Sequence, residues 1–483
     1  MTEFPHDPDW IENHTYDEIR VGDTARLQRT LTEDDIDLFA AMSGDVNPAH
    51  VDPEYASQTR FHGVIAHGMW GGALISTVLG TQFPGPGSIY ISQSLSFEQP
   101  LHVGDTLDVV VTVKEKLDAG HRVRLDCRCT DQEGQEVIAG EAVVKAPTEK
   151  VRRPRVAPAH VRLSHPQRRY QALLQQAASL TALKTAVVHP CTEEALKGAL
   201  DAHAAGLIEP ILVGPIDKIR ATAAAADLDL GSLPIVDVPH SHAAAATAVA
   251  MAQRGEVGAL MKGSLHTDEL MGEVVKPANG LRTERRVSHT FVLDVPSYPK
   301  PLLISDAAIN VTPDLEAKRD IVQNAIELAR ALGITQPRVA ILSAVETVNP
   351  RMSSTLDAAA LCKMADRGQI TGGLVDGPLA FDNAVNLQAA KDKGIVSPVA
   401  GQADILIAPD LEAGNMLSKQ LQYLADAQAA GIVLGARVPV VLTSRADGPA
   451  ARVASCALAL LLNQFLADEA ARKGGSAAAK SGA

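Results

Sequence analysis

The spacing of hydrophobic residues along the chain changes near residue 150. Between about residues 88 and 148, apolar and polar residues alternate with a period of two, which predicts half-buried antiparallel strands. Turns that contain glycine separate the alternating stretches. The predicted strands cover residues 88–97, 106–116, 122–130 and 136–145.

Two helices are expected ahead of these strands. Thr32 can cap a helix over residues 33–42, and Asp35 stands at the reciprocal position of a capping box. Residues 68–79 are apolar on every side of a helix, so this second helix is expected to be buried. One buried helix beside a run of antiparallel strands predicts an α+β domain over residues 1–148.

From about residue 184, short β-rich stretches alternate with helical patterns. The clearest helix covers residues 314–332, with Pro313 at its first turn and Gly333 beyond its end. The alternation predicts an α/β domain over residues 165–470, with a mostly parallel sheet and helices on both faces. The predicted strands are residues 185–189, 210–213, 258–261, 302–305, 339–343, 373–375, 405–408 and 438–443.

Two segments are expected outside these domains. Residues 149–164 are rich in arginine and proline and lack hydrophobic periodicity, which predicts a basic linker. A solvated tether is one interpretation of this linker, and a clamp for an anionic cofactor is the other. Residues 471–483 are predicted to form a flexible tail.

Composition narrows the classes of function. The 483 residues are 46% hydrophobic but only 3% aromatic, which predicts a core of small aliphatic side chains and no stacking platform for nucleic acid. The net charge of -13 also argues against a nucleic-acid partner. No apolar run reaches ~18 residues and no secretory signal is seen, so we expect no membrane partner and a cytoplasmic location. Five scattered cysteines without a CxxC pair indicate a reducing compartment and no metal site.

The first candidate site follows the first predicted helix. Asp45 and His50 lie five residues apart in a segment that Gly44 and Pro48 keep out of the helix. Gly68 opens the apolar helix, where backbone N–H groups lack intrahelical acceptors and suit an oxyanion. A carboxylate, an imidazole and such N–H groups can add water to a double bond conjugated to a thioester. The alternative, from the residues alone, is a tight turn beside a surface histidine.

Two stretches in this region carry a family resemblance. SGDVNPAHVDPEYA and, after it, RFHGVIAHGMWGGALIS resemble the MaoC-like, (R)-specific enoyl-CoA hydratases of the hot-dog fold, over residues 15–148. The resemblance implies a dimeric enzyme that hydrates trans-2-enoyl-CoA to (R)-3-hydroxyacyl-CoA.

The resemblance also implies a role for each matching residue. Asp45 and His50 match the catalytic pair, and Gly68 matches the residue whose N–H polarises the thioester carbonyl. Ser76 matches a serine that supports the aspartate loop, and Asn47 matches the asparagine of that loop.

The second candidate site is expected where three predicted strands of the α/β domain end. Residues 375–383, 408–419 and 442–447 each end a β-rich stretch and open a helix, and we expect all three turns at one edge of one sheet. Gly414 and Asn415 are expected to let the backbone approach an anion at a helix start, and a hydroxyl and cationic side chains nearby suit a phosphate group. Ordinary βα turns with helix caps are the alternative. The candidate anion-binding residues are Asn415, Lys419, Ser444 and Arg445.

These segments resemble the phosphate acetyl/butyryltransferases over residues 165–468, in blocks such as GLVDGPLAFDNAV, ADILIAPDLEAGNMLSKQL and VPVVLTSRADGPAARVASCALA. The resemblance implies exchange of an acyl group between CoA and phosphate, by attack of the CoA thiolate on the acyl phosphate carbonyl. It implies that Ser444 stabilises the transition state and that Arg445 binds phosphate. Asn415 and Lys419 fall in the block that implies a phosphate loop.

Two positions depart from the acetyl-type pattern. Ala451 stands where those enzymes carry a catalytic aspartate, so the nearest carboxylate, Asp447, becomes the candidate catalytic group. Tyr423 stands where they tend to carry an arginine. An acyl-cysteine intermediate is a further alternative, but Cys456 lies in an apolar helix and is interpreted as a packing residue.

The sequence thus predicts an α+β hot-dog domain followed by an α/β, phosphotransacetylase-like domain, in a bifunctional hydratase and phosphate acyltransferase. CoA thioesters and phosphate are expected as substrates, with no permanently bound cofactor, and two-fold contacts are expected to build a homo-oligomer. One alternative keeps the hydratase and makes the second domain a non-catalytic acyl-CoA sensor or assembly module. The other is a scaffold in which neither site works.

Overall fold

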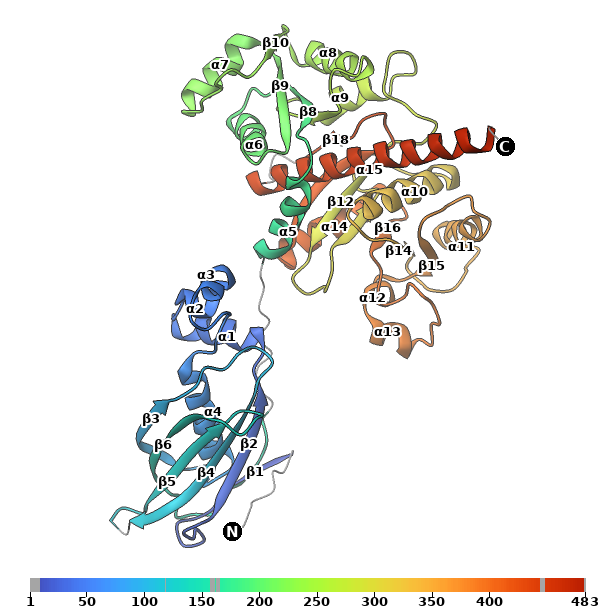
Figure 1. Ribbon diagram of the computed structural model, residues 1–483. Coiled ribbons are helices and arrows are strands. Elements are labelled where there is room, and N and C mark those ends of the chain that lie inside the picture. The colour runs from blue at the N-terminus through green and yellow to red at the C-terminus, as the bar shows by residue number, and fades with distance from the viewer. Residues whose placement is uncertain (1–8, 118, 157–160, 162–165, 444–447, 482–483) are drawn as a thin grey trace. The chain divides into compact units, whose positions relative to one another are not determined.

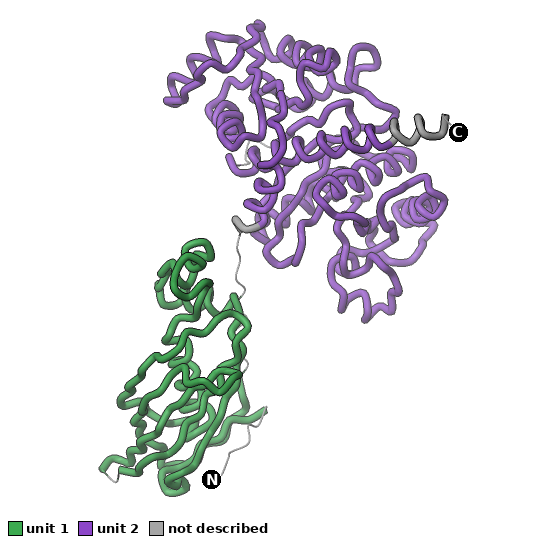
Figure 2. Tube along the Cα trace, viewed as in Figure 1, with its two compact units in different colours: residues 1–163 green, residues 164–483 purple. Residues whose placement is uncertain are grey.

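The computed structural model describes residues 9–117, 119–156, 161, 166–443 and 448–481 (Figure 1). The chain divides into two compact units, residues 1–163 and residues 164–483 (Figure 2). The division falls within the basic stretch in which the sequence predicted a linker.

Unit 1 is an antiparallel sheet wrapped around one helix (Figure 1). Within the described residues, its main sheet has 5 strands in the order β2-β4-β5-β6-β3. The elements of unit 1 are β1 (Trp10–Glu12), β2 (Thr24–Thr30), α1 (Glu33–Ser43), α2 (Pro48–Val51), α3 (Pro53–Gln58), α4 (Gly68–Thr81), β3 (Ile89–Phe97), β4 (Thr106–Leu117), β5 (Arg122–Thr130), β6 (Glu136–Lys145) and β7 (Arg152–Pro154). The four predicted strands and both predicted helices are confirmed within one or two residues at each end.

Helix α4 packs closely on this sheet because small residues face it. A Cβ at Gly71 would lie 2.3 Å from Cδ1 of Ile138, so a larger residue here would require the Ile138 side chain to move. Trp70 and Ile75 are buried in the same core, but Met69 is 55% exposed. The expectation that α4 is buried on every side is therefore wrong, because the sheet covers only one face of the helix.

Three further strands of unit 1, β1, β2 and β7, lie where the sequence analysis placed none. Strand β2 extends the main sheet at β4, and β1 pairs with β7 in a separate antiparallel ladder. The guanidinium of Arg152 lies 4.7 Å from the centre of the Trp10 ring. Part of the predicted linker, residues 152–154, is therefore paired to the start of the chain within unit 1.

Unit 2 is built on one large sheet with helices on both faces (Figure 1). Across its described residues the sheet has 11 strands in the order β10-β9-β8-β11-β18-β17-β12-β13-β16-β14-β15. The strands of unit 2 are β8 (Leu183–Val188), β9 (Ile208–Gly214), β10 (Ile235–Asp237), β11 (Ala259–Lys262), β12 (Ser288–Asp294), β13 (Leu302–Ser305), β14 (Arg338–Leu342), β15 (Leu374–Leu379), β16 (Ile405–Ile407), β17 (Gln428–Leu434) and β18 (Val440–Val441).

The helices of unit 2 cover three hydrophobic clusters, one of which lies beneath α5, α6, α10, α11 and α15. The predicted helix over residues 314–332 is confirmed as α10, with Asp314 as its N-cap. These helices are α5 (Pro166–Ala178), α6 (Glu193–Ala204), α7 (Ile216–Ala225), α8 (Ser241–Gln253), α9 (Thr267–Val274), α10 (Leu315–Ala331), α11 (Ser353–Asp366), α12 (Phe381–Val385), α13 (Leu387–Asp392), α14 (Leu411–Leu424) and α15 (Pro449–Ser481).

The sheet of unit 2 is mixed rather than uniformly parallel in its middle. Strands β12 and β17 pair antiparallel with each other, and each also pairs antiparallel with its other neighbour. The sequence analysis did not identify β12 or β17, and with them it missed the reversal of strand direction. Direction leaves no mark in the periodicity of a strand, so a buried antiparallel strand has the same pattern as a buried parallel one.

Helix α15 is the one described helix long and apolar enough to cross a membrane, over Pro449–Arg472. In this structure 56% of its most apolar window is buried, and it packs against α5, α6, α10 and β17. A core helix passes the same length test, and the burial favours that interpretation. The helix continues to Ser481, whereas the sequence predicted a flexible tail from residue 471; alanine-rich sequence favours helix there.

Candidate active sites

The candidate site of unit 1 lies where the chain leaves α1. Gly44 ends this helix in the left-handed conformation, with φ 76°, and its N–H donates to the main-chain oxygen of Ala40 at 2.8 Å. The next residue, Asp45, is exposed, and its own N–H donates to the Ser43 hydroxyl at 3.2 Å. The carboxylate of Asp45 is therefore presented from a short loop directly after a capped helix.

His50 lies on the short helix α2, which follows this loop. Asn47 caps α2, because its side-chain oxygen accepts from the Ala49 N–H at 3.1 Å. The Nδ1 atom of His50 lies 2.8 Å from the main-chain oxygen of Ile65. A carbonyl oxygen can only accept, so Nδ1 carries the proton, and Nε2 of the neutral ring is left as an acceptor. His50 is thus held in the tautomer that can accept a proton from water.

Gly68 is the first residue of α4, so its own N–H has no acceptor within the helix. A Cβ at this position would lie 3.0 Å from two ring carbons of Phe97. The backbone at Gly68 is exposed and the Phe97 ring is 51% exposed, so both are accessible from solvent. This end of α4 can donate an N–H to an oxyanion, and the missing Cβ makes room for the neighbouring ring.

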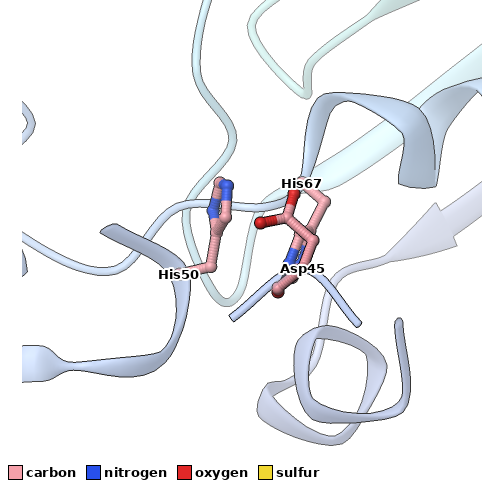
Figure 3. A group of neighbouring side chains, drawn as sticks. All are labelled: Asp45, His50 and His67. Carbon is pink, nitrogen blue, oxygen red and sulfur yellow. Dashed lines mark hydrogen bonds between the residues drawn. The ribbon is translucent and has the colours of Figure 1, made fainter. Parts of the chain in front are cut away.

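These groups meet in one place. A carboxylate oxygen of Asp45, a ring nitrogen of His50 and a ring nitrogen of His67 lie within 4.8 Å of one another. Figure 3 shows the Asp45 carboxylate turned toward the His50 ring. One water molecule with two hydrogen bonds of about 2.8 Å spans roughly 4.6 Å between its two acceptors, a spacing that the 4.8 Å limit on these separations allows.

The same three side chains form a donor set that a metal ion can use, two imidazoles and a carboxylate. The rings of His50 and His67 lie with centroids 4.0 Å apart and planes tilted by 32°. Nδ1 of His50 and Nε2 of His67 each bond to a main-chain oxygen, which leaves one nitrogen of each ring for another partner. The prediction of no metal here stays a prediction.

The structure does not bring every predicted residue of unit 1 to this place. Ser76 lies on the exposed face of α4, eight residues beyond Gly68 and therefore about 12 Å along the helix axis. Among the described residues no hydrogen bond joins Ser76 to the Asp45 loop. His67, by contrast, was not selected from the sequence, although its Nε2 lies 2.9 Å from the main-chain oxygen of Asp45. The one signal in the sequence that could have indicated His67 is its position directly before Gly68, where a helix was expected to begin.

At the candidate site of unit 2, strands β13, β16 and β18 end at the same level across the sheet. Ser305, the last residue of β13, pairs with Ile407 at the end of β16 and with Thr290 of β12. Thr290 pairs with Ile432 of β17, and Ile432 pairs with Val441 at the end of β18. The ends of β13, β16 and β18 therefore fall on one line across the sheet, and two of these, β16 and β18, are predicted site strands.

The directions of these strands correct one expectation. Since three successive antiparallel pairings separate β18 from β13, β18 runs opposite to β13, β16, β14 and β15. The turns after β15 and β16 thus leave the sheet in one direction, and the chain after β18 leaves in the other. The expectation that all three turns lie at one edge is wrong, because it assumed a uniformly parallel sheet.

The turn after β13 was missed by the sequence analysis. The buried carboxylate of Asp306 accepts from the N–H groups of Ala308, Ile309 and Asn310 at 2.9, 3.1 and 3.0 Å. It also accepts from the N–H of His289 on β12 at 3.3 Å. The side-chain amide of Asn310 also donates to it, so four backbone N–H groups and one amide fix the backbone of this turn beside the row of strand ends.

Helix α14 begins differently from the prediction for Gly414 and Asn415. The helix starts at Leu411 behind the N-cap Asp410, so Gly414 is its fourth residue and is buried. A Cβ at Gly414 would lie 2.3 Å from the main-chain oxygen of Asp306. This glycine therefore packs the helix onto the Asp306 turn, and the expectation that its backbone is open to an anion is wrong.

The side chains of α14 nevertheless lie next to the same turn. Asn415 donates from Nδ2 to the main-chain oxygen of Ala307 at 3.1 Å. Lys419 is half-buried one turn further on and donates to Gln422 at 3.3 Å. Tyr423, 68% exposed, follows with its ring centre 5.9 Å from the Lys419 ammonium. The structure thus places Asn415 beside the β13 turn, and Lys419 one helical turn further along α14.

The remaining predicted residues of this site, Ser444, Arg445 and Asp447, lie outside the described residues. Ala451 is described, in the first turn of α15. It lines a pocket of about 280 Å³, together with Asp294 and Arg169, which form an ion pair at 2.6 Å. The carboxylate nearest to Ala451 within the lining of this pocket is therefore already paired with an arginine.

The fold and these two sites define a chain with a hot-dog domain and a phosphotransacetylase-type α/β domain. Residues 20–130 match the family described as MaoC like domain, and residues 240–460 match the phosphate acetyl/butaryl transferase family. A phosphate acetyltransferase of Rhizobium meliloti is 63% identical over 293 residues, which are 61% of this chain and 93% of the relative.

Two solved structures are similar to the two parts of the chain. A branched-chain phosphotransacylase from Enterococcus faecalis V583 is 29% identical with a TM-score of 0.51, over 58% of this chain and 99% of its own. The R-hydratase PhaJ1 from Pseudomonas aeruginosa is 43% identical with a TM-score of 0.31, over 32% of this chain and 99% of its own. The chain belongs to the phosphate acetyl/butyryltransferase family, is an enzyme, and carries a MaoC-like domain ahead of that part. The family resemblances drawn from the sequence, and with them the fold classes of both domains, are confirmed.

Proposed function

We propose that the chain is a bifunctional enzyme acting on CoA thioesters. Unit 1 hydrates trans-2-enoyl-CoA to (R)-3-hydroxyacyl-CoA, and unit 2 converts acyl-CoA and phosphate to acyl phosphate and CoA. The observation that carries the hydratase is the approach of the Asp45 carboxylate to a ring nitrogen of His50, whose Nδ1 is held by the main-chain oxygen of Ile65. The similarity to phosphate acetyltransferases supports the transferase.

In the hydration step, Asp45 and Nε2 of His50 hold one water molecule between them. As His50 accepts a proton from this water, the hydroxyl forms a bond to C3 of the enoyl thioester. The electron pair of the double bond moves toward the thioester oxygen, which the Gly68 N–H stabilises as an enolate. A proton then returns from the Asp45–His50 pair to C2, so the elements of water are added without a cofactor.

In the transfer step, the CoA thiolate attacks the carbonyl carbon of an acyl phosphate. A carbon–sulfur bond forms, the bond to the phosphate oxygen breaks, and inorganic phosphate leaves; the reverse reaction consumes acyl-CoA. Ser444 and Arg445 are assigned to the transition state and the phosphate, and Asp447 to the thiol proton. Asn415 and Lys419 are assigned to the phosphate side of the site.

A second candidate function follows from Ala451. The position carries no carboxylate, and it faces a pocket whose aspartate is paired with an arginine. If Asp447 does not replace the missing base, unit 2 binds acyl-CoA without turning it over, as a sensor or an assembly module.

The edge of the unit 1 sheet supports a homo-oligomer built on two-fold contacts. Strand β3 ends the sheet, and four of its large apolar side chains are exposed: Ile89 (56%), Tyr90 (40%), Ile91 (47%) and Phe97 (51%). An unpaired apolar edge is unfavourable in water, and a second copy of the same strand would cover it.

The test measures both reactions with single-site variants of the full chain. Hydration is followed as loss of the conjugated absorbance of crotonyl-CoA, and transfer as CoA release from butyryl-CoA or acetyl-CoA with phosphate or arsenate. Asp45→Asn should remove hydration and leave transfer unchanged, and Ser444→Ala should do the reverse. Hydration that survives in Asp45→Asn would contradict the hydratase, and the absence of any phosphate-dependent or arsenate-dependent CoA release would leave the sensor.

A further inference from the structure

His67 makes the contact that joins the Asp45 loop to helix α4. Its side chain is 3% exposed, and Nε2 lies 2.9 Å from the main-chain oxygen of Asp45. Because that oxygen can only accept, Nε2 carries the proton and donates it. The hydrogen bond reaches the backbone of Asp45 rather than its carboxylate, so it fixes the loop and leaves the carboxylate available.

The ring of His67 is itself held on several sides. The Phe39 ring of α1 lies with its centroid 4.9 Å away, and the His50 ring of α2 lies with its centroid 4.0 Å away. The backbone before it is fixed, since Ala66 donates to the main-chain oxygen of Leu101 at 2.8 Å. One side chain therefore contacts both helices that flank the Asp45 loop and starts a third.

The remaining bonds of the Asp45 loop are local. The Asp45 N–H donates to Ser43 two residues before it at 3.2 Å, and the Asn47 N–H donates to the Asp45 carboxylate at 3.3 Å. Such contacts shape the turn but do not place it relative to α4. The bond from His67 spans 22 positions in the sequence and, among the described residues, links this loop to the start of the helix that carries Gly68.

We propose that His67 is a positioning residue for the hydration reaction, acting through the main chain of Asp45. Its hydrogen bond sets the distance from the Asp45 carboxylate to His50 and to the Gly68 N–H, and it does not contact the substrate. This inference rests on the proposed hydratase function of unit 1. Since a shift of about 1 Å in a reacting group can lower a rate on the order of 10²-fold, the loss of this bond should appear in kcat.

Two substitutions separate the hydrogen bond from the packing of the ring. Gln at position 67 keeps an N–H donor close to the place of Nε2 but loses the aromatic ring. Phe keeps the ring between its aromatic neighbours but loses the donor. His102→Phe is the matched control, since it also replaces a histidine with a phenylalanine, at a half-buried position of unit 1.

The experiment measures kcat and KM for crotonyl-CoA hydration by the full-length variants, with thermal unfolding as the check on folding. For His67→Phe we expect kcat to fall about 10- to 100-fold while KM stays within about 2-fold. His67→Gln should restore kcat to within about 5-fold of the wild type, and His102→Phe should match the wild type. Hydrogen exchange in a peptide that covers residues 44–49 should be faster in His67→Phe than in His67→Gln.

Three results would overturn the inference. A His67→Phe variant with wild-type kcat shows that the hydrogen bond is not needed. A His67→Gln variant as impaired as His67→Phe shows that ring packing, a purely structural role, is what matters. Absence of hydration in the folded wild type would overturn the proposed hydratase and this inference together, whereas the first two results leave the hydratase standing.

Discussion

Gly414 lies so close to Asp306 that a Cβ at Gly414 would be 2.3 Å from the main-chain oxygen of Asp306. This contact fixes α14 against the turn after β13 and thereby sets the positions of Asn415 and Lys419. The glycine is needed for the close approach of two backbones, not for an unusual φ.

Gly414→Ala should therefore push α14 away from the Asp306 turn. We expect transferase activity to fall about tenfold or more, and unit 2 to lose about 1–3 kcal/mol of unfolding free energy from overpacking. Hydration by unit 1 should not change. Denaturant unfolding and both assays on one preparation check this.

The control for this substitution is Gly272→Ala on α9, where a Cβ would meet nothing within 4 Å. Removing a glycine from an exposed helix position should raise stability by up to about 1 kcal/mol. If Gly414→Ala keeps full transferase activity, the position of α14 does not matter for the reaction.

His50→Asn separates the two nitrogens of the catalytic imidazole. The Asn amide can still donate to the main-chain oxygen of Ile65, as Nδ1 of His50 does at 2.8 Å, but it has no group at the place of Nε2. Hydration should fall about 10²–10⁴-fold, since a general base is lost, while the unfolding midpoint stays close to that of the wild type. Steady-state rates with crotonyl-CoA and thermal unfolding measure the two effects.

His62→Asn is the matched exchange at an exposed position of the same unit, where φ is 56° and Asn is well tolerated. It should leave hydration unchanged. A His50→Asn enzyme as active as His62→Asn would rule out His50 as the base.

Gly68→Ala tests the first turn of α4 as the oxyanion site. The N–H remains, but the added Cβ would lie 3.0 Å from the Phe97 ring, so either the ring or the helix start must move by a few tenths of an ångström. We expect kcat/KM for crotonyl-CoA to fall about 10-fold, and Phe97→Leu in the same chain to restore part of it, because Leu is smaller than Phe. If the double variant is no better than Gly68→Ala, the Phe97 contact does not explain the loss.

The local features of unit 1 could be predicted because short-range chemistry encodes them. The capping box at Thr32 forms as expected, with the Asp35 N–H donating to the Thr32 hydroxyl at 3.2 Å. Gly44 ends α1 and Pro48 starts the short helix α2, and so Asp45 on the loop and His50 on α2 come to lie close together. Each of these local structures depends on neighbours only a few residues away in the sequence.

The missed features depend on partners that are distant in the sequence. His67 reaches Asp45 across 22 residues, and Asp306 accepts from His289 across 17. The order and direction of the middle strands of unit 2 depend on pairings such as Thr290 with Ile432, which no local pattern specifies. The sequence therefore indicated which residue types form the sites, but not the backbone contacts that hold them.

The cysteine thiols give a test of the transferase mechanism. Burial raises the pKa of Cys456 to about 12, and burial, followed by the nearby Asp376, raises that of Cys362 to about 12. Burial also raises the pKa of Cys127 to about 11 and that of Cys129 to about 12. Because the thiolate is the reactive form, a thiol of pKa 12 at pH 8 carries roughly 10³-fold less thiolate than a free one.

At pH 8 the native protein should therefore react slowly with a disulfide reagent, and the half-buried Cys191 should react first. All 5 thiols should react at once in concentrated guanidinium chloride. Mass spectrometry after incubation with acetyl-CoA should show no acyl group on cysteine, since direct attack by the CoA thiolate needs no acyl-enzyme. Rapid labelling of Cys362 or Cys456 in the folded protein, or a stable acyl adduct on either, would favour transfer through a cysteine.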